Sequence, residues 1–292
     1  MKSVGIIGYG FVGLACETGF QDIADVRVYD KYKNTESLEA VVRKSKILFL
    51  CLPTPMSQDG SCDTSIIRDT VARINDLAIS TKLIVLKSTV PPGTTQSLAD
   101  EFQNHQFVFN PEFLREKTFV QDFLNQNRII LGTTKGFDLG MLSHIYSLYD
   151  KFVKRQKADG AFPAEMIITN STIAEMVKYT TNAYLATKLS FFNEIHQICE
   201  SIDVDYGAVR DFVLKDPRIE KSHTSVPGHD GDYGWGGKCL VKDVNALIAF
   251  CWDRDIDETM LTAAWFKNLM VRKDHDWEAI PGATHLTGFE KE

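Results

Sequence analysis

The stretch GWGGKCLVKD, residues 234 to 243, places a thiol and a carboxylate four residues apart, behind two glycines. In a helix predicted over Cys239–Phe250, Cys239 lies in the first turn, where the helix dipole stabilises a thiolate. Asp243 then lies on the same face of that helix. A nucleophilic thiol beside a carboxylate, reached past small residues, is typical of covalent catalysis. A buried structural cysteine is the alternative, because most unpaired cysteines are core residues.

A second set of polar residues lies along another predicted helix. Thr172-Ile-Ala-Glu175 has the pattern of a capping box, and no Gly or Pro follows before about Ser201. Spacings of three, four and seven place these side chains near one line along the helix: Glu175, Lys178, Asn182, Leu189 and Asn193. A lone lysine on a helix is ordinarily solvated. Because apolar residues flank this line, a buried lysine beside an asparagine indicates a functional role.

The chain opens with the pattern of a dinucleotide-binding turn. A short apolar strand over Ser3–Gly8 leads into GYGFVG, a GxGxxG sequence, and a helical stretch follows it. A second strand, Val26–Tyr29, ends at Asp30, 22 positions after Gly8. The glycines allow a tight turn and close approach of a pyrophosphate to a helix N-terminus, and the acid binds the ribose hydroxyls. The contacts predicted for the cofactor are Gly8, Gly10, Phe11, Val12, Gly13 and Asp30.

The carboxylate of Asp30 favours NAD over NADP, because it repels a 2′-phosphate. Lys31 and Lys33 keep NADP open as an alternative. A glycine-rich turn in some other α/β protein is the second alternative, since three glycines alone carry little information.

Further apolar runs predict buried strands over Ile47–Leu52, Leu83–Lys87, Phe107–Phe109 and Arg128–Leu131. Each ends in a loop rich in Pro, Gly or Thr: PTPMSQDGS, STVPPGTT, NPEFLRE and GTTKG. Helical patterns over 65–77 and 138–152 alternate with the strands. The sequence therefore predicts a Rossmann-like, doubly wound parallel sheet over residues 1–169, with ligands at the carboxyl ends of its strands. Residues 170–292 are predicted to form an all-α domain that carries Cys239.

The net charge of −7 argues against binding to nucleic acid or to an anionic membrane. Six scattered cysteines without a CxxC pair predict a reduced, cytoplasmic protein without a zinc site, and no metal is expected. The N-terminus runs directly into the first strand without a cleavable signal, and no apolar run approaches the length of a membrane helix.

Several longer stretches together resemble the UDP-glucose/GDP-mannose 6-dehydrogenase family. They follow the family's order and are GYGFVGL at 8–14, CLPTP at 51–55, DGSCD at 59–63, STVPPGTT at 88–95, NPEFLRE at 110–116, AEMVKYTTNAYLATKLSFFNEI at 174–195 and GWGGKCLVKD at 234–243. The resemblance extends nearly from the N-terminus to about residue 272. It implies an NAD-dependent, four-electron oxidation of the C6 hydroxyl of a nucleotide sugar. The first oxidation gives an aldehyde that the cysteine captures, and the second gives a thioester that water hydrolyses.

Site roles carried over from this resemblance fall on matching positions. Cys239 is implied as the nucleophile, Lys178 and Asn182 as oxyanion donors, and Asp243 as the group that activates water together with Lys178. Glu112 is a second acid/base candidate. Further implied cofactor contacts are Pro53, Thr54, Thr89 and Glu116; Thr89 is also a candidate water contact. Implied sugar contacts are Glu112, Phe113, Leu114, Arg115, Lys178, Asn182, Tyr233, Gly236 and Gly237, with the two glycines making room for C6. Arg218 resembles an arginine that reaches the substrate of a partner subunit, so a homodimer is expected.

Departures from the family pattern affect recognition of the nucleotide. Family members usually contain a further nucleotide-binding domain, so this sequence is expected to be a short form without it. A separate chain that supplies this domain is an alternative. Lys238 and Val241 replace the usual residues around the cysteine, and Lys238 is expected to lower the pKa of the thiol. UDP-glucose is favoured over GDP-mannose. A two-electron hydroxyacid-type dehydrogenase and a non-catalytic nucleotide-binding relic remain alternatives.

Overall fold

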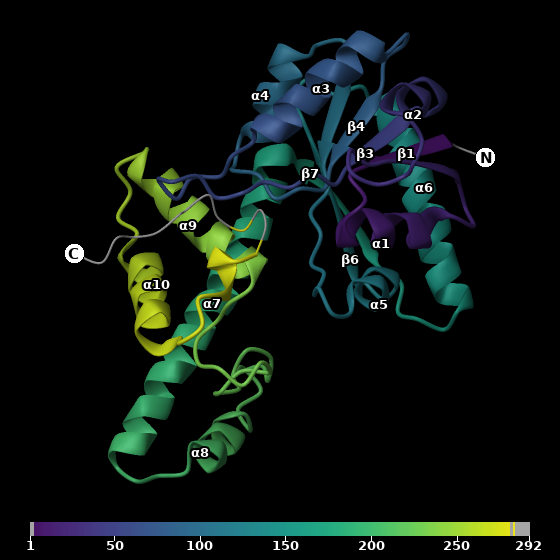
Figure 1. Cartoon of the computed structure of the whole chain (residues 1–292). Coiled ribbons are helices and arrows are strands. Elements are labelled where there is room, and N and C mark those ends of the chain that lie inside the picture. Colours follow the sequence, from purple (N-terminus) through teal and green to yellow (C-terminus); the bar gives the residue numbers. More distant parts are fainter. Residues whose placement is uncertain (1–2, 281–282, 284–292) are drawn as a thin grey trace. The chain divides into compact units, whose positions relative to one another are not determined.

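The computed structural model describes residues 3–280 and residue 283. Its contacts divide the chain into two compact units. The N-terminal unit comprises residues 1–54 and 64–178, and the helical unit comprises residues 55–63 and 179–292 (Figure 1). The segment 55–63, which follows the third strand, thus packs with the helical unit. The domain boundary predicted at residue 169 stays a prediction.

A seven-stranded sheet forms the centre of the N-terminal unit, in the order β2-β1-β3-β4-β5-β6-β7. Its strands are β1 Ser3–Ile7, β2 Asp25–Tyr29, β3 Ile47–Leu50, β4 Leu83–Leu86, β5 Gln106–Phe109, β6 Arg128–Thr133 and β7 Glu165–Asn170. The order reverses at β1 and β3, as in a Rossmann-like sheet, so a crevice is expected beyond the carboxyl ends of these strands. The predicted fold is confirmed, and β7 is an additional strand that the sequence did not indicate.

Strand β6 runs antiparallel to β5, and β7 pairs parallel with β6. The loop GTTKG therefore begins at the edge of the sheet opposite to the ends of β1 and β3–β5. The prediction that it joins the ligand-binding loops was wrong. An apolar run shows that a strand is buried on both faces but carries no information about its direction.

Helices cover both faces of this sheet (Figure 1). Alternate residues of each central strand enter opposite cores: Val4 and Ile6 pack with α1, α5 and α6, and Ile7 packs with α2, α3 and α4. The helices are α1 Phe11–Phe20, α2 Leu38–Lys44, α3 Ser65–Leu77, α4 Thr94–Glu101, α5 Phe119–Leu124 and α6 Leu139–Ala158. These two hydrophobic cores hold the ends of the strands, and hence their loops, in fixed register.

The helical unit contains most of the long helix α7, Ser171–Ser201, together with α8 Tyr206–Val213, α9 Lys238–Trp252, α10 Thr259–Val271 and the short 3-10 helix η1 Asp276–Glu278 (Figure 1). Its largest core cluster packs the rings of Trp235 and Trp277 with Val241, Val244 and Ile248 of α9. Val241, a departure from the family pattern, is thus a core residue. This packing fixes the start of α9. Over the described residues, no helix is long and apolar enough to cross a membrane.

Helix α7 begins differently from the prediction. Asn170 caps it, because the Asn170 Oδ1 accepts a hydrogen bond from the Ile173 N–H at 2.8 Å. Glu175 is not part of a capping box. Its buried carboxylate accepts hydrogen bonds from the backbone N–H of Gly93 at 2.6 Å and of Thr95 at 2.8 Å, at the start of α4. Burial raises the pKa of Glu175 even though these hydrogen bonds act in the opposite direction.

The predicted polar line along α7 is buried, and Glu175, Lys178, Asn182 and Asn193 are each less than 10% exposed. The expectation that the apolar flanks are buried as well holds only on one side. Tyr179, Ala183 and Phe192 are buried, but other large apolar side chains of α7 are exposed: Met176, Tyr184, Phe191 and Ile198.

Candidate active site

The loop between β1 and α1 requires two of its glycines for different reasons. Gly8 has a φ of +93°, which side chains disfavour. At Gly13 an added Cβ would lie 2.1 Å from the carbonyl oxygen of Gly8. Gly10 precedes α1 without a side-chain cap, and no described atom lies within 4 Å of where its Cβ would be. The space beside Gly10 at the start of α1 is therefore open, and an open helix N-terminus suits the pyrophosphate of a dinucleotide.

Asp30 follows β2 and lies against the same loop. Its carboxylate accepts hydrogen bonds from the N–H of Tyr9 at 2.7 Å and of Tyr32 at 2.9 Å. Burial raises the pKa of Asp30, but these hydrogen bonds and the charge of Lys33 outweigh it and hold the pKa below its ordinary value. The ammonium of Lys33 donates to the Tyr9 carbonyl at 2.5 Å. An ionised Asp30 beside a lysine already engaged by the loop fits NAD better than NADP.

Two alanine substitutions in this loop are expected to separate cofactor binding from folding. Gly10→Ala places a methyl group in the space expected for the pyrophosphate, so NAD affinity should fall at least tenfold with an unchanged melting temperature. Gly13→Ala forces the loop away from Gly8 and should also cost about 2 kcal/mol of stability. Calorimetric NAD titration and thermal unfolding measure the two effects. Gly10→Ala with wild-type NAD affinity would contradict this placement of the cofactor.

Other predicted cofactor contacts lie on loops at the carboxyl ends of β3, β4 and β5. Pro53 is exposed, whereas the buried Thr54 donates its hydroxyl proton to the Thr89 carbonyl at 2.9 Å. That bond ties together the loops after β3 and β4. Glu116 is exposed in the turn before α5. Because these strands are parallel, the loops meet at one edge of the sheet, next to the glycine-rich turn.

Glu112 and Lys178 form a buried ion pair in the N-terminal unit. The Lys178 ammonium donates to the Glu112 carboxylate at 2.9 Å and to the Glu112 carbonyl at 2.7 Å. The other carboxylate oxygen accepts from the Leu114 N–H at 2.7 Å. Burial raises the pKa of Glu112, but the charge of Lys178, these hydrogen bonds and the charge of Lys87 outweigh it, so the pKa is lowered. Glu112 is therefore held as a carboxylate next to a cation.

Phe113 and Arg115 of the NPEFLRE loop make different kinds of contact. Two cations lie near the ring of Phe113, with the Arg128 guanidinium 4.0 Å and the Lys178 ammonium 5.5 Å from its centroid. Arg115, predicted to contact the sugar, is exposed and instead pairs with Asp122 at 2.5 Å. Phe113 is thus fixed beside the ion pair, and Arg115 is directed to another partner.

A second polar cluster lies in the helical unit, around the buried Asp243. The Asn182 amide donates to Asp243 Oδ2 at 2.6 Å, and the Lys242 ammonium donates to Oδ1 at 2.5 Å. Asn182 lies one turn beyond Lys178 on α7, as predicted from their spacing. Asp243 lies one turn beyond Cys239 on α9, and Cys239 occupies the first turn of that helix. The helix that the sequence predicted from Cys239 is thus confirmed.

Lys242 is a functional candidate that the sequence analysis missed. It is 8% exposed, and its pKa is raised. Burial alone would lower that pKa, but the charges of Asp243, Cys62 and Cys239 and the hydrogen bond to Asp243 outweigh it. A cation placed here favours negative charge on the Cys239 sulfur. The spacing of three residues between Cys239 and Lys242 is the signal in the sequence that could have identified it.

The two glycines before Cys239 have separate roles. A Cβ on Gly236 would lie 2.3 Å from the Arg272 guanidinium and 2.4 Å from the Asp276 carboxylate, so packing inside the helical unit requires this glycine. Gly237 has a φ of +74°, and no described atom lies within 4 Å of where its Cβ would be. The expectation that both glycines make room for a substrate therefore fits Gly237 alone.

The loop after α8 carries Arg218 and Tyr233. Arg218 is exposed and pairs with Asp216 at 2.6 Å. The Tyr233 ring lies 5.4 Å from the ring of His196 on α7. Neither residue belongs to the cluster around Asp243.

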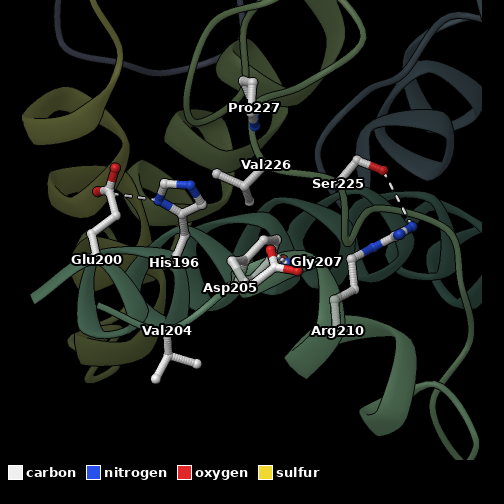
Figure 2. A pocket seen from close by; sticks show the side chains of 10 residues that line it. His196, Glu200, Val204, Asp205, Gly207, Arg210, Ser225, Val226 and Pro227 are labelled. Carbon is white, nitrogen blue, oxygen red and sulfur yellow. Dashed lines mark hydrogen bonds and ion pairs between the residues drawn. The ribbon is translucent and has the colours of Figure 1, made fainter. Parts of the chain in front are cut away.

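A pocket of about 390 Å³ lies between this loop, the end of α7 and the start of α8 (Figure 2). Figure 2 shows His196 beside Glu200, with Nδ1 and Oε2 3.3 Å apart, and Arg210 reaching Ser225, with Nη2 and Oγ 3.3 Å apart. None of the predicted site residues lines this pocket. Its contacts instead fasten the loop that carries Arg218 and Tyr233.

The chain combines a Rossmann-like unit, which carries an NAD-type glycine loop, with an α-helical unit, which carries a thiol at a helix start. The continuous helix α7 runs from one unit into the other. These features are typical of a class of nucleotide-dependent dehydrogenases. The sequence model described as "UDP-glucose/GDP-mannose dehydrogenase family, NAD binding domain" matches residues 16–152, and the model of that family's central domain matches residues 172–268. The chain belongs to the UDP-glucose/GDP-mannose dehydrogenase family, and its N-terminal unit contains the family's NAD-binding domain.

Individual relatives agree with this assignment. The chain is 30% identical to UDP-glucose 6-dehydrogenase TuaD of Bacillus subtilis (strain 168) over 85% of this chain and 59% of the relative. It is 31% identical to UDP-glucose 6-dehydrogenase of Rickettsia bellii (strain RML369-C) over 90% of this chain and 61% of the relative. A solved UDP-glucose dehydrogenase from Pyrobaculum islandicum superimposes with a TM-score of 0.80 at 27% identity, over 92% of this chain and 68% of that one. The chain thus spans about 60% of the length of the first two relatives.

Proposed function

We propose that this chain is an NAD-dependent nucleotide-sugar 6-dehydrogenase that oxidises UDP-glucose to UDP-glucuronate through a covalent intermediate on Cys239. The observation that supports it best is the buried cluster of Asn182, Lys242 and Asp243, in which Asp243 lies one turn from Cys239. Burying two charged groups and an amide is costly for stability alone, so their retention favours a catalytic role. The names of the relatives favour UDP-glucose as the substrate.

NAD, when bound, supplies the hydride acceptor for both oxidations. The glycine loop and the first N–H groups of α1 would bind its pyrophosphate, and Asp30 would bind a ribose. Pro53, Thr54, Thr89 and Glu116 would form the remaining wall of that site. The first oxidation gives a C6 aldehyde, which is open to attack by a thiolate.

Cys239 is proposed to attack the aldehyde carbon and form a thiohemiacetal, and the second oxidation converts it to a thioester. Lys178 and Asn182 would stabilise the negative charge that develops on the C6 oxygen in each addition step, and a donor of this kind is worth roughly 3 kcal/mol. Asp243 would take a proton from the water that attacks the thioester, which releases the carboxylate product and the Cys239 thiol. Lys242 would hold Asp243 in place and favour the thiolate.

The remaining site residues are proposed to hold the sugar. Glu112 is a second acid/base group, and Phe113, Leu114, Tyr233 and Gly237 would contact the substrate. Arg218 and Arg115, whose guanidinium groups pair with Asp216 and Asp122, would have to exchange those partners to reach it. A homodimer is proposed through the exposed apolar side chains of α7, and a cytoplasmic location is part of the same proposal.

Initial rates of NADH formation with UDP-glucose and with GDP-mannose test the proposed substrate. The wild-type chain should oxidise UDP-glucose faster, and Lys178→Met should lower that rate about a hundredfold or more, because one charge-stabilising donor is lost. Faster oxidation of GDP-mannose would replace the proposed substrate.

A further inference from the structure

A buried lysine lies behind the ion pair of Glu112 and Lys178, at the end of β4. Lys87 is 2% exposed, and its ammonium donates to Asn110 Oδ1 at 3.1 Å and to the Pro111 carbonyl at 3.5 Å. It also lies 5.8 Å from the centroid of the Phe123 ring. Both hydrogen-bond partners are neutral, although a buried ammonium ordinarily has a carboxylate partner.

Asn110 connects Lys87 to the surrounding elements. Its Oδ1 also accepts a hydrogen bond from the Tyr149 hydroxyl of α6 at 2.5 Å, and its Nδ2 donates to the Ile130 carbonyl of β6 at 2.8 Å. Its backbone N–H donates to the Leu86 carbonyl of β4 at 2.8 Å. Asn110 is therefore fastened to β4, β6 and α6, two residues before Glu112, which pairs with Lys178.

The charge of Lys87 lowers the pKa of Glu112, the residue after Pro111. Among the described residues, the groups that interact electrostatically with this carboxylate are Lys178 of α7, Lys87 at the end of β4, and the thiols of Cys16 on α1 and Cys51 after β3. Only the two lysines are cations. Lys178 touches Glu112 directly, whereas Lys87 acts through space and through the backbone of Pro111.

We propose that Lys87 is a positioning residue for Glu112, which fixes the Asn110–Glu112 segment through hydrogen bonds and keeps the Glu112 carboxylate ionised when Lys178 is engaged with substrate. The inference rests on the proposed function, in which Lys178 stabilises charge on the C6 oxygen. During such a step Lys178 shares its charge with the substrate, and Lys87 is then the cation that remains available to Glu112. Its hydrogen bonds to the neutral Asn110 and Pro111 do not change when Lys178 engages the substrate.

Two substitutions separate the charge of Lys87 from its hydrogen bonds. Lys87→Met removes both the charge and the donor, whereas Tyr149→Phe removes a hydrogen bond to the same Asn110 oxygen and leaves the charge in place. Lys87→Arg restores a cation. The readout is the titration of the Glu112 carboxyl carbon by NMR in the ¹³C-glutamate-labelled whole chain without substrate, with Glu112→Gln identifying the signal.

The Glu112 midpoint should move to higher pH in Lys87→Met, return toward the wild-type value in Lys87→Arg, and stay unchanged in Tyr149→Phe. In steady-state assays the acid limb of the kcat profile should move in the same direction in Lys87→Met alone. An unchanged midpoint in Lys87→Met, or equal shifts in Lys87→Met and Tyr149→Phe, would overturn the proposal. If Lys87→Met does not fold, Lys87→Gln takes its place with the same expected shift. Because the NMR titration needs no substrate, failure of the proposed oxidation leaves its outcome readable.

Discussion

Cys239→Ser should lower steady-state oxidation of UDP-glucose by about a thousandfold or more, because an alcohol is a much weaker nucleophile than a thiolate at neutral pH. NAD affinity should stay at the wild-type value, since the glycine loop and Asp30 belong to the N-terminal unit. The assay is NADH formation at saturating NAD, with the affinity for NAD measured separately by calorimetry.

Cys251→Ser is the matched control for that substitution. Cys251 lies on the same helix α9, is buried, and is not part of the cluster around Asp243. It should keep turnover within about threefold of wild type. Wild-type turnover in Cys239→Ser, or equal losses in the two variants, would remove the covalent route.

Lys242→Met should destabilise the chain by about 3 kcal/mol, because it leaves the carboxylate of Asp243 buried without its cation. The double variant Lys242→Met/Asp243→Asn should recover most of that loss, since no unpaired charge then remains. Urea unfolding of the wild type, of Lys242→Met, of Asp243→Asn and of the double variant at pH 7 measures the coupling. Independent, additive losses would show that the two side chains do not form a pair in solution.

The same pair predicts a dependence on alkaline pH. The folded state raises the pKa of Lys242 above its ordinary value of 10.5. A group whose pKa is raised on folding adds stability below its unfolded pKa, and that stability is lost as pH rises through the folded value. The wild type should therefore lose the advantage over Lys242→Met only above about pH 10.5.

The alternation of strands and helices could be predicted from the sequence because each central strand is an apolar run that is buried between two cores. Residues of β1, β3 and β4 alternate between those cores, and their loops carry the predicted turn residues. The direction of β6 and the existence of β7 could not be predicted from the sequence. Hydrophobic pattern reports burial, whereas strand direction depends on long-range pairing.

The sequence predicted those parts of the candidate site that depend only on the spacing of residues along one helix. Cys239 with Asp243, and Lys178 with Asn182, are each four residues apart, and the structure gives each pair one face of a helix. Lys242 and Lys87 escaped notice because a lysine in a sequence is ordinarily assigned to solvent. Glu175 was assigned to a capping box, since nothing in the local sequence shows that its carboxylate contacts α4, some 80 residues earlier in the chain.

The most direct test of the central claim is the yield of NADH from a limiting amount of UDP-glucose with excess NAD and the wild-type chain. Two NADH per sugar, with UDP-glucuronate as the product, is the expected result, because both oxidations occur before release. One NADH per sugar with an aldehyde product, or no NADH at all, would contradict the four-electron oxidation proposed for this chain.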